Sequence, residues 1–121
     1  MFDIQTEQHG NIFIMRLLGS VLLPDALQFS KQLTALTASS SISQAVLDLS
    51  QVTAIDKAGL GVLVSMSTRY RGGGRRLVLL APAPHVVQIL KDAQIEGFFP
   101  TFDTEQELRG YFPGITGNPE K

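Results

Sequence analysis

Residues 45–66 read AVLDLSQVTAIDKAGLGVLVSM and contain the change of periodicity that decides the fold. The first part, AVLDLS at 45–50, is a short apolar run typical of a buried strand. The pattern then becomes that of a helix, which we expect over 58–71 and which ends at the three glycines 72–74. A second buried strand, RRLVLLA at 75–81, follows at once. A strand, a helix and a strand joined by short links predict a crossover and a parallel pair of strands.

The residues before this unit predict a hairpin and a first helix. The runs DIQTEQ and NIFIMRLLG bracket His9-Gly10-Asn11, which has the spacing of a hairpin turn. The next segment, PDALQFSKQLTAL at 24–36, begins with Pro24, a residue favoured in the first turn of a helix. Its apolar residues recur at helical spacing, at Ala26, Phe29, Leu33 and Leu36.

The residues after the unit predict two more helices and a short extended piece. PHVVQILKDAQ at 84–94 has helical periodicity, and FFPTFD at 98–103 is the extended piece. TEQELRGYF at 104–112 is the last predicted helix. We expect Asp103 to be its N-cap and Gln106 to reply in a pattern like a capping box.

The whole series predicts the α/β class. We expect a single domain over residues 1–112, with a mixed β-sheet made of an N-terminal hairpin and then parallel strands, and about four helices packed on it. Residues 113–121, PGITGNPEK, carry two Pro and two Gly in nine residues and are expected to be a flexible C-terminal tail.

The composition excludes several classes of function. The chain has 121 residues, no Cys and a formal net charge of −1. Without Cys there are no disulfides, thiolate metal sites or thiol nucleophiles, and without a basic excess we expect no direct binding to nucleic acid. The N-terminus lacks the order of a signal peptide, and no apolar run approaches the roughly 20 residues of a membrane span. We therefore expect a cytoplasmic protein with no membrane insertion.

The turn between the predicted strand and helix is the first candidate site. Asp56 is a favoured N-cap residue, because its carboxylate can accept a hydrogen bond from an N–H of the first helical turn. Ala58, Gly59 and Gly61 keep the turn narrow, so that the backbone of a partner or an anion can approach closely. Lys57 is unusual, because a cation at a helix N-terminus opposes the helix dipole. It is either a solvated lysine beside its cap or a charge that faces a partner.

The helix after Asp56 has two stripes of side chains. The stripe that we assign to the core consists of Leu60, Leu63, Val64 and Ser67. A second stripe points elsewhere and consists of Val62, Met66 and Arg69. The second stripe either packs against a neighbouring helix or forms an interface with a partner, to which a methionine adapts well.

The remaining polar residues do not form a catalytic or metal-binding constellation. His9 and His85 are the only histidines, and neither has a second ligand at metal-binding spacing, so we expect both at the surface. Asp48 and Asp56 lie at opposite ends of one strand–loop segment and do not make an acid/base pair. Asp48 is expected to be a strand residue satisfied by local hydrogen bonds. We expect a protein that is not an enzyme and has no cofactor.

The sequence GGGRR at 72–76 resembles a phosphate-binding loop in composition only, because its glycines follow a helix rather than precede one. Helix termination explains these glycines. The arginines around that end, where cations favour the helix dipole, are Arg69, Arg71, Arg75 and Arg76. A site for a nucleotide or an acidic partner stays open there, although nothing in the sequence supports nucleotide binding.

The stretch AVLDLSQVTAIDKAGLGVLVSM, followed by RRLVLLAPAPHVVQILKDAQIEGFFPTFDTEQEL, resembles the STAS domain of bacterial anti-sigma-factor antagonists. The resemblance extends from about Phe2 to Phe112. Its most specific parts are DLSQVTAID leading to GLGVL, and the closing order of a helix, FFPTF and an acidic helix. It implies a binding module that docks on an anti-sigma factor, itself a serine kinase of the ATP-binding type, and thereby frees the sigma factor.

The resemblance also implies a switch, because members of the family lose docking when a Ser or Thr of an Asp-x-Ser-Gly turn is phosphorylated. A phosphate adds about −1.5 to −2 charges at the contact surface. The position that matches this acceptor is Ala58, which has no oxygen to phosphorylate, and the position before it, often Ser or Thr, is Lys57. A relocated acceptor stays open among the nearby hydroxyl residues Ser50, Ser65, Ser67 and Thr68.

We interpret the chain as a non-catalytic regulator of transcription that docks on an anti-sigma factor through the Asp56 turn and the following helix, without the usual phospho-switch. The residues expected to contact this partner are Asp56, Lys57, Ala58, Gly59, Gly61, Val62, Met66 and Arg69. The alternative is an accessory subunit of an ABC-type lipid-transport complex, in which small STAS-like proteins also occur.

Overall fold

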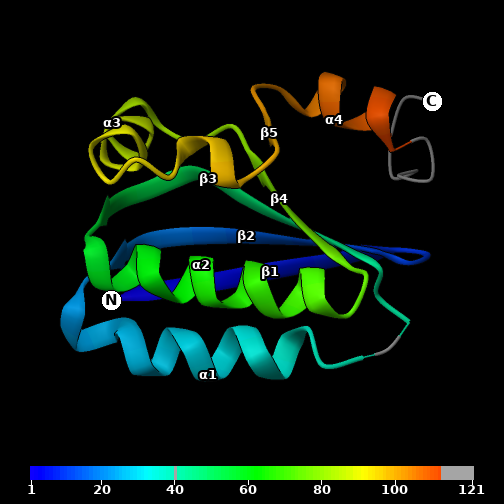
Figure 1. The fold of residues 1–121 in the computed structure, drawn as a ribbon, viewed down its shortest axis with the longest axis horizontal. Helices are drawn as coiled ribbons and strands as arrows, with labels where there is room; N and C mark the ends of the chain where they lie inside the picture. Colours follow the sequence, from blue (N-terminus) through cyan, green and yellow to red (C-terminus); the bar gives the residue numbers. More distant parts are fainter. Residues whose placement is uncertain (40, 113–121) are drawn as a thin grey trace.

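The computed structural model describes residues 1–39 and 41–112, and its centre is a five-stranded sheet whose strand order follows the sequence (Figure 1). The strands are β1 (Phe2–His9), β2 (Ile12–Val21), β3 (Gln44–Ile55), β4 (Arg76–Leu80) and β5 (Thr101–Phe102). β1 pairs antiparallel with β2, and the other three neighbouring pairs are parallel. The predicted α/β class and mixed sheet are confirmed.

Every parallel connection passes through a helix, as the alternating pattern predicted. The helices are α1 (Ala26–Leu36), α2 (Lys57–Gly72), α3 (Pro84–Asp92) and α4 (Glu105–Tyr111), and two single 3-10 turns, η1 (Leu23–Asp25) and η2 (Glu96–Phe98), precede α1 and β5. None of these helices is both long and apolar enough to cross a membrane. The tail predicted at 113–121 lies outside the described residues.

The hairpin closes with a two-residue turn rather than with the three residues expected. His9 is the last residue of β1 and pairs with Ile12, so that only Gly10 and Asn11 form the turn. Gly10 has a φ of +63°, a conformation that the favoured hairpin turns require and that glycine adopts without strain.

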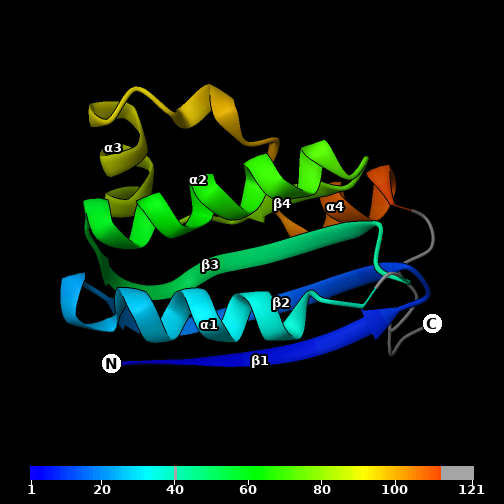
Figure 2. The same ribbon diagram turned by 60° about the horizontal axis from the view of Figure 1, so that its bottom comes forward.

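The main core lies between one face of the sheet and the helices α1, α2 and α3. Strand side chains alternate between the two faces, and Met15, Leu47 and Leu79 point to this one with no exposed surface. Phe29 of α1 and Leu63 of α2 are equally buried in the same cluster. Figure 2 shows α1 and α2 lying side by side along the sheet.

The opposite face carries a smaller apolar cluster under α4. Its buried members are Ile12, Ile14, Val46, Val78, Leu80, Leu108 and Phe112. The expected N-cap of α4 was wrong by one residue. Thr104 is the N-cap, since its Oγ1 accepts from the N–H of Glu107 at 3.1 Å and the Glu107 carboxylate accepts from the N–H of Asp103 at 3.0 Å. Thr104 and Glu107 therefore have the capping roles that were expected of Asp103 and Gln106.

Candidate functional site

Asp56 joins β3 to α2 and caps the first turn of that helix, as predicted. Its Oδ1 accepts from the N–H groups of Ala58 at 3.1 Å and Gly59 at 3.2 Å. Its Oδ2 accepts from the N–H of Leu23 at 2.9 Å, which ties η1 to the start of α2. Both carboxylate oxygens are therefore engaged inside the protein. The N–H groups of Ala58 and Gly59 are therefore not available to an anion, because they already donate to the Asp56 carboxylate.

Gly59 is buried, and the expectation that it contacts a partner was wrong. A Cβ atom at this position would lie 2.7 Å from Cγ1 of Ile55 and 2.9 Å from the carbonyl oxygen of Val21. The reason is packing, because α2 begins directly against the ends of β2 and β3. Glycine serves here to allow that close approach.

Lys57, Ala58 and Gly61 form the accessible part of the turn. Lys57 and Gly61 are exposed one helical turn apart, and Ala58 is half-buried. No atom lies within 4 Å of the place where a Cβ of Gly61 would stand. None of the ion pairs found within residues 1–39 and 41–112 includes Lys57. The turn thus presents a cation and a patch of uncovered backbone.

Two apolar hollows flank Lys57, where the start of α2 meets the C-terminal end of α3. The first, of about 290 Å³, is lined by Lys57, Leu60, Gly61, Val64, Ala93 and Ile95. The second, also of about 290 Å³, is lined by Ile55, Asp56, Lys57, Ile89, Asp92 and Ala93. The lysine therefore stands between two recesses that apolar side chains of another protein can enter.

Exposed leucines lie at the same end of the molecule and were not predicted from the sequence. Leu22 is 38%, Leu23 71% and Leu27 68% exposed, although large apolar side chains are usually covered. Asp25 holds η1 in place, because its carboxylate accepts from the N–H of Leu22 at 3.1 Å and pairs with the N-terminal ammonium at 3.2 Å. These contacts, the first above all, lower the pKa of Asp25. The signal in the sequence was Leu27, which falls outside the apolar stripe of α1.

The second stripe of α2 lies on the side of the helix that faces α1. Met66 is 1% exposed and belongs to the main core, so its expected role in partner contact was wrong. Val62 is half-buried against the same core, and the Arg69 guanidinium lies 3.5 Å from Oγ1 of Thr34 on α1. Val64, assigned to the core, is half-buried against the main core and also lines the first hollow. The physical reason is that α2 is covered on two sides, by the sheet and by α1.

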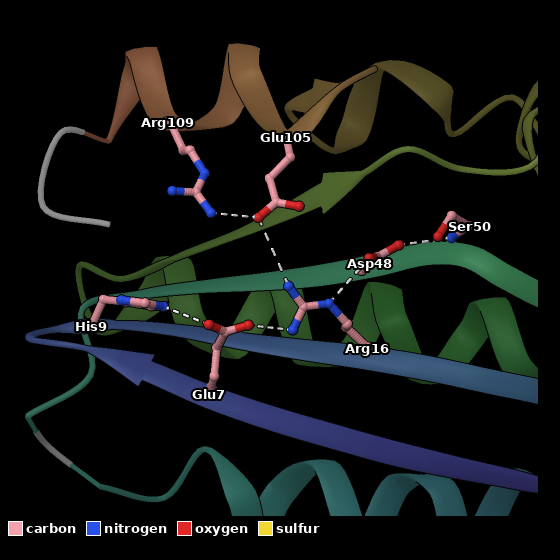
Figure 3. A network of polar contacts seen from close by, with 7 residues as sticks. All are labelled: Glu7, His9, Arg16, Asp48, Ser50, Glu105 and Arg109. Atoms are coloured by element: carbon pink, nitrogen blue, oxygen red, sulfur yellow. Dashed lines mark hydrogen bonds and ion pairs between the residues drawn. The ribbon is translucent and has the colours of Figure 1, made fainter. Parts of the chain in front are cut away.

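A charged network lies on the other face of the sheet, beneath α4 (Figure 3). Arg16 of β2 donates to Glu7, and its guanidinium also lies 3.6 Å from Oδ2 of Asp48 and 3.9 Å from Oε2 of Glu105. The hydrogen bond with Glu7 raises the pKa of Arg16. The same bond, and then a 2.8 Å contact with the His9 ring, lower the pKa of Glu7. The network links the hairpin, β3 and α4.

The two other predictions for this region have different outcomes. Asp48 accepts a hydrogen bond from the N–H of Ser50 at 2.9 Å, which confirms that local hydrogen bonds satisfy its carboxylate. His9 was expected at the surface, but its side chain is only 9% exposed, because its contact with Glu7 holds it against the sheet. Within the described residues, no three His, Asp or Glu side chains come together as metal ligands.

The comparisons with known proteins agree with this architecture. The STAS domain family model matches residues 3–108. The structure is similar to an anti-sigma factor antagonist from Mycobacterium paratuberculosis, with a TM-score of 0.81, 18% identity and coverage of 93% of this chain and 95% of that one. It is also similar to the antagonist SpoIIAA in its unphosphorylated form, with a TM-score of 0.74, 16% identity and coverage of 97% and 100%.

One further neighbour is a part of a larger protein. The murine anion transporter Slc26a9 matches with a TM-score of 0.72 and 17% identity, over 90% of this chain but only 19% of the transporter. At these identities the solved structures establish a shared fold, which is that of the anti-sigma factor antagonists. Because the family model matches most of the length of this chain, the chain belongs to the STAS domain family.

Proposed function

We propose that this protein is a non-catalytic regulator that docks on an anti-sigma factor with serine kinase activity, and that phosphorylation of the docking turn does not control it. The observation that carries the proposal is Ala58. It stands in the first turn of α2, at the position that matches the acceptor of the family, and its side chain is a methyl group. A kinase that reached this turn would find no hydroxyl to modify.

The surface around Ala58 supports docking. Lys57 is exposed between the two apolar hollows, and Leu23 is exposed on the adjoining η1. Apolar recesses beside an exposed charge are typical of a protein interface, in which the apolar contacts supply affinity and the charge supplies register. We expect the partner to place apolar side chains in the hollows and a carboxylate near Lys57.

The first experiment identifies the partner and maps the contact. The full chain captures its partner from native lysate, mass spectrometry identifies it, and calorimetry with the purified partner compares Lys57→Glu with Lys31→Glu. Both lysines are exposed, and Lys31 lies in the middle of α1. We expect Lys57→Glu to weaken binding at least about tenfold, or about 1.4 kcal/mol, and Lys31→Glu to leave it unchanged. Equal effects of the two variants place the interface elsewhere. Capture of an ATPase with membrane subunits, and of no kinase, favours the lipid-transport alternative.

The second experiment tests the missing switch. The captured kinase and ATP are incubated with the wild-type chain and with Ala58→Ser, and phosphate incorporation is measured by mass spectrometry. We expect the wild type to stay unmodified and bound, whereas Ala58→Ser offers a hydroxyl in the same turn. A stoichiometric phospho-form of the wild type that no longer binds contradicts the proposal and points to a relocated acceptor.

A further inference from the structure

A basic pocket lies at the other end of α2, which is 16 residues and therefore about 24 Å long. Its volume is about 360 Å³, and its wall includes Gln44, Ser67, Arg71, Gly74, Arg75 and Arg76. Three of the residues that line it are arginines, and none is an aspartate or a glutamate. The pocket therefore concentrates positive charge on a chain whose net charge is −1.

The end of α2 brings these residues together. Arg71 lies in the last turn of the helix, and the chain then reverses at Gly74, whose φ of +75° favours glycine. The N–H of Arg75 returns to the carbonyl of Tyr70 at 2.7 Å, and Arg76 begins β4 beside Gln44 of β3. The sequence already placed these arginines around the end of the helix, and strand pairing adds Gln44 of β3 to them.

The arginines are held in place without being neutralised. Arg71 donates to the carbonyl of Phe98 and stacks 4.2 Å from the centre of that ring. Arg75 stacks 4.6 Å from the centre of the Tyr70 ring, and Arg76 donates to the Tyr111 hydroxyl at 2.8 Å.

None of the three has a carboxylate within 4.0 Å among the residues that the structure describes. A guanidinium has five N–H donors, so several donors on each arginine remain available.

Gln44 adds a second, independent observation. Its Oε1 is buried in the wall and accepts no hydrogen bond within the described chain. A buried amide oxygen without a partner is unfavourable by about 1–3 kcal/mol.

We propose that this pocket binds a small anion with two adjacent phosphate groups, either free or as part of a larger metabolite. Phosphate oxygens match the planar fork of an arginine, and three arginines that line one recess suit several negative charges. The volume is within the range of about 300–1,000 Å³ typical of small-molecule sites. A recess of this kind favours a small molecule over the flat acidic surface of a protein. The site is separate from the Asp56 turn and does not depend on the proposed docking.

Calorimetry with inorganic pyrophosphate tests the proposal on the full chain at physiological salt. We expect saturable binding that weakens at least about tenfold in Arg76→Gln, and in Arg71→Lys, which keeps the charge but loses the fork. Lys91→Gln removes an exposed charge from α3 and serves as the control, with affinity expected within about twofold of the wild type. A nucleoside diphosphate in a parallel titration shows whether the ligand is free diphosphate or a larger metabolite, according to which binds more tightly.

Three results overturn the proposal. The first is the absence of saturable binding of either diphosphate below about 1 mM. The second is equal weakening in Lys91→Gln and Arg76→Gln, and the third is equal affinity for pyrophosphate, sulfate and citrate, which indicates unspecific charge attraction. Circular dichroism of each variant confirms the fold first. Within the described residues the Arg76 side chain makes one hydrogen bond, to Tyr111, so Arg76→Gln remains informative if Arg71→Lys is unstable.

Discussion

Two glycines near the start of α2 form a matched test of how this helix enters the fold. An alanine at Gly59 places a methyl group 2.7 Å from Cγ1 of Ile55 and 2.9 Å from the carbonyl oxygen of Val21. The backbone oxygen cannot move without a shift of the end of β2. The same substitution at Gly61 meets no atom within 4 Å. Both changes replace a helical glycine by alanine, so they differ only in what the methyl group meets.

The expected magnitudes follow from this difference. Alanine is favoured over glycine in a helix by about 1 kcal/mol, and Gly61→Ala should raise the free energy of unfolding by up to that amount. Gly59→Ala has the same gain, but overpacking in a tight site costs about 1–3 kcal/mol. The propensity term cancels between the two variants. Gly61→Ala should therefore be more stable than Gly59→Ala by about 1–3 kcal/mol.

Urea unfolding followed by circular dichroism measures this difference, with the midpoints compared at an unchanged slope. Equal stability of the two variants would refute the close contact of α2 with the ends of β2 and β3. The affinity for the captured partner is an independent readout for Gly61→Ala, because its methyl group enters the wall of the first hollow.

Three further results are expected from the same unfolding assay. Asp56→Ala removes the cap and should lower the free energy of unfolding by about 1–2 kcal/mol, whereas Asp56→Asn can still cap and should lose less; equal losses contradict the capping role. Met66→Ala should cost about 2–5 kcal/mol, and a neutral effect would place this side chain on the surface. Arg16 lowers the pKa of Glu7 in the folded protein, so that the unfolded chain binds this proton first as the pH falls. The stability that the Glu7 carboxylate contributes is therefore complete above its ordinary pKa of 4.5 and is lost as the pH falls below that value. The urea midpoint should therefore fall less steeply below about pH 4.5 in Glu7→Gln than in the wild type, and parallel curves contradict the pairing.

Most elements could be predicted because their signals are local. The helix expected over 58–71 is α2 (Lys57–Gly72), because an N-cap aspartate and terminal glycines mark its ends. The strand expected at 45–50 extends to Ile55 instead, since its second half pairs with the end of β2. Strand length depends on a partner that is distant in the sequence, and periodicity does not report it.

The candidate site was predicted only in part. Asp56 as an N-cap followed from residue type and position. The burial of Met66 did not, because it depends on α1 lying beside α2. The exposed Leu23 was missed for the converse reason, since an apolar residue next to a helix start is indistinguishable from a core residue until the packing is known.

The sequence by itself determined the order of strands and helices, the capped turn at Asp56 and the methyl group at Ala58, because these depend on neighbouring residues and on side-chain chemistry. Tertiary structure alone decided which side of α2 is covered, where the hollows beside Lys57 lie, and that Gln44 shares one pocket with Arg71 and Arg76. Those features arise from the packing of segments that are far apart in the chain. Their distances are set by the whole core rather than by any local pattern.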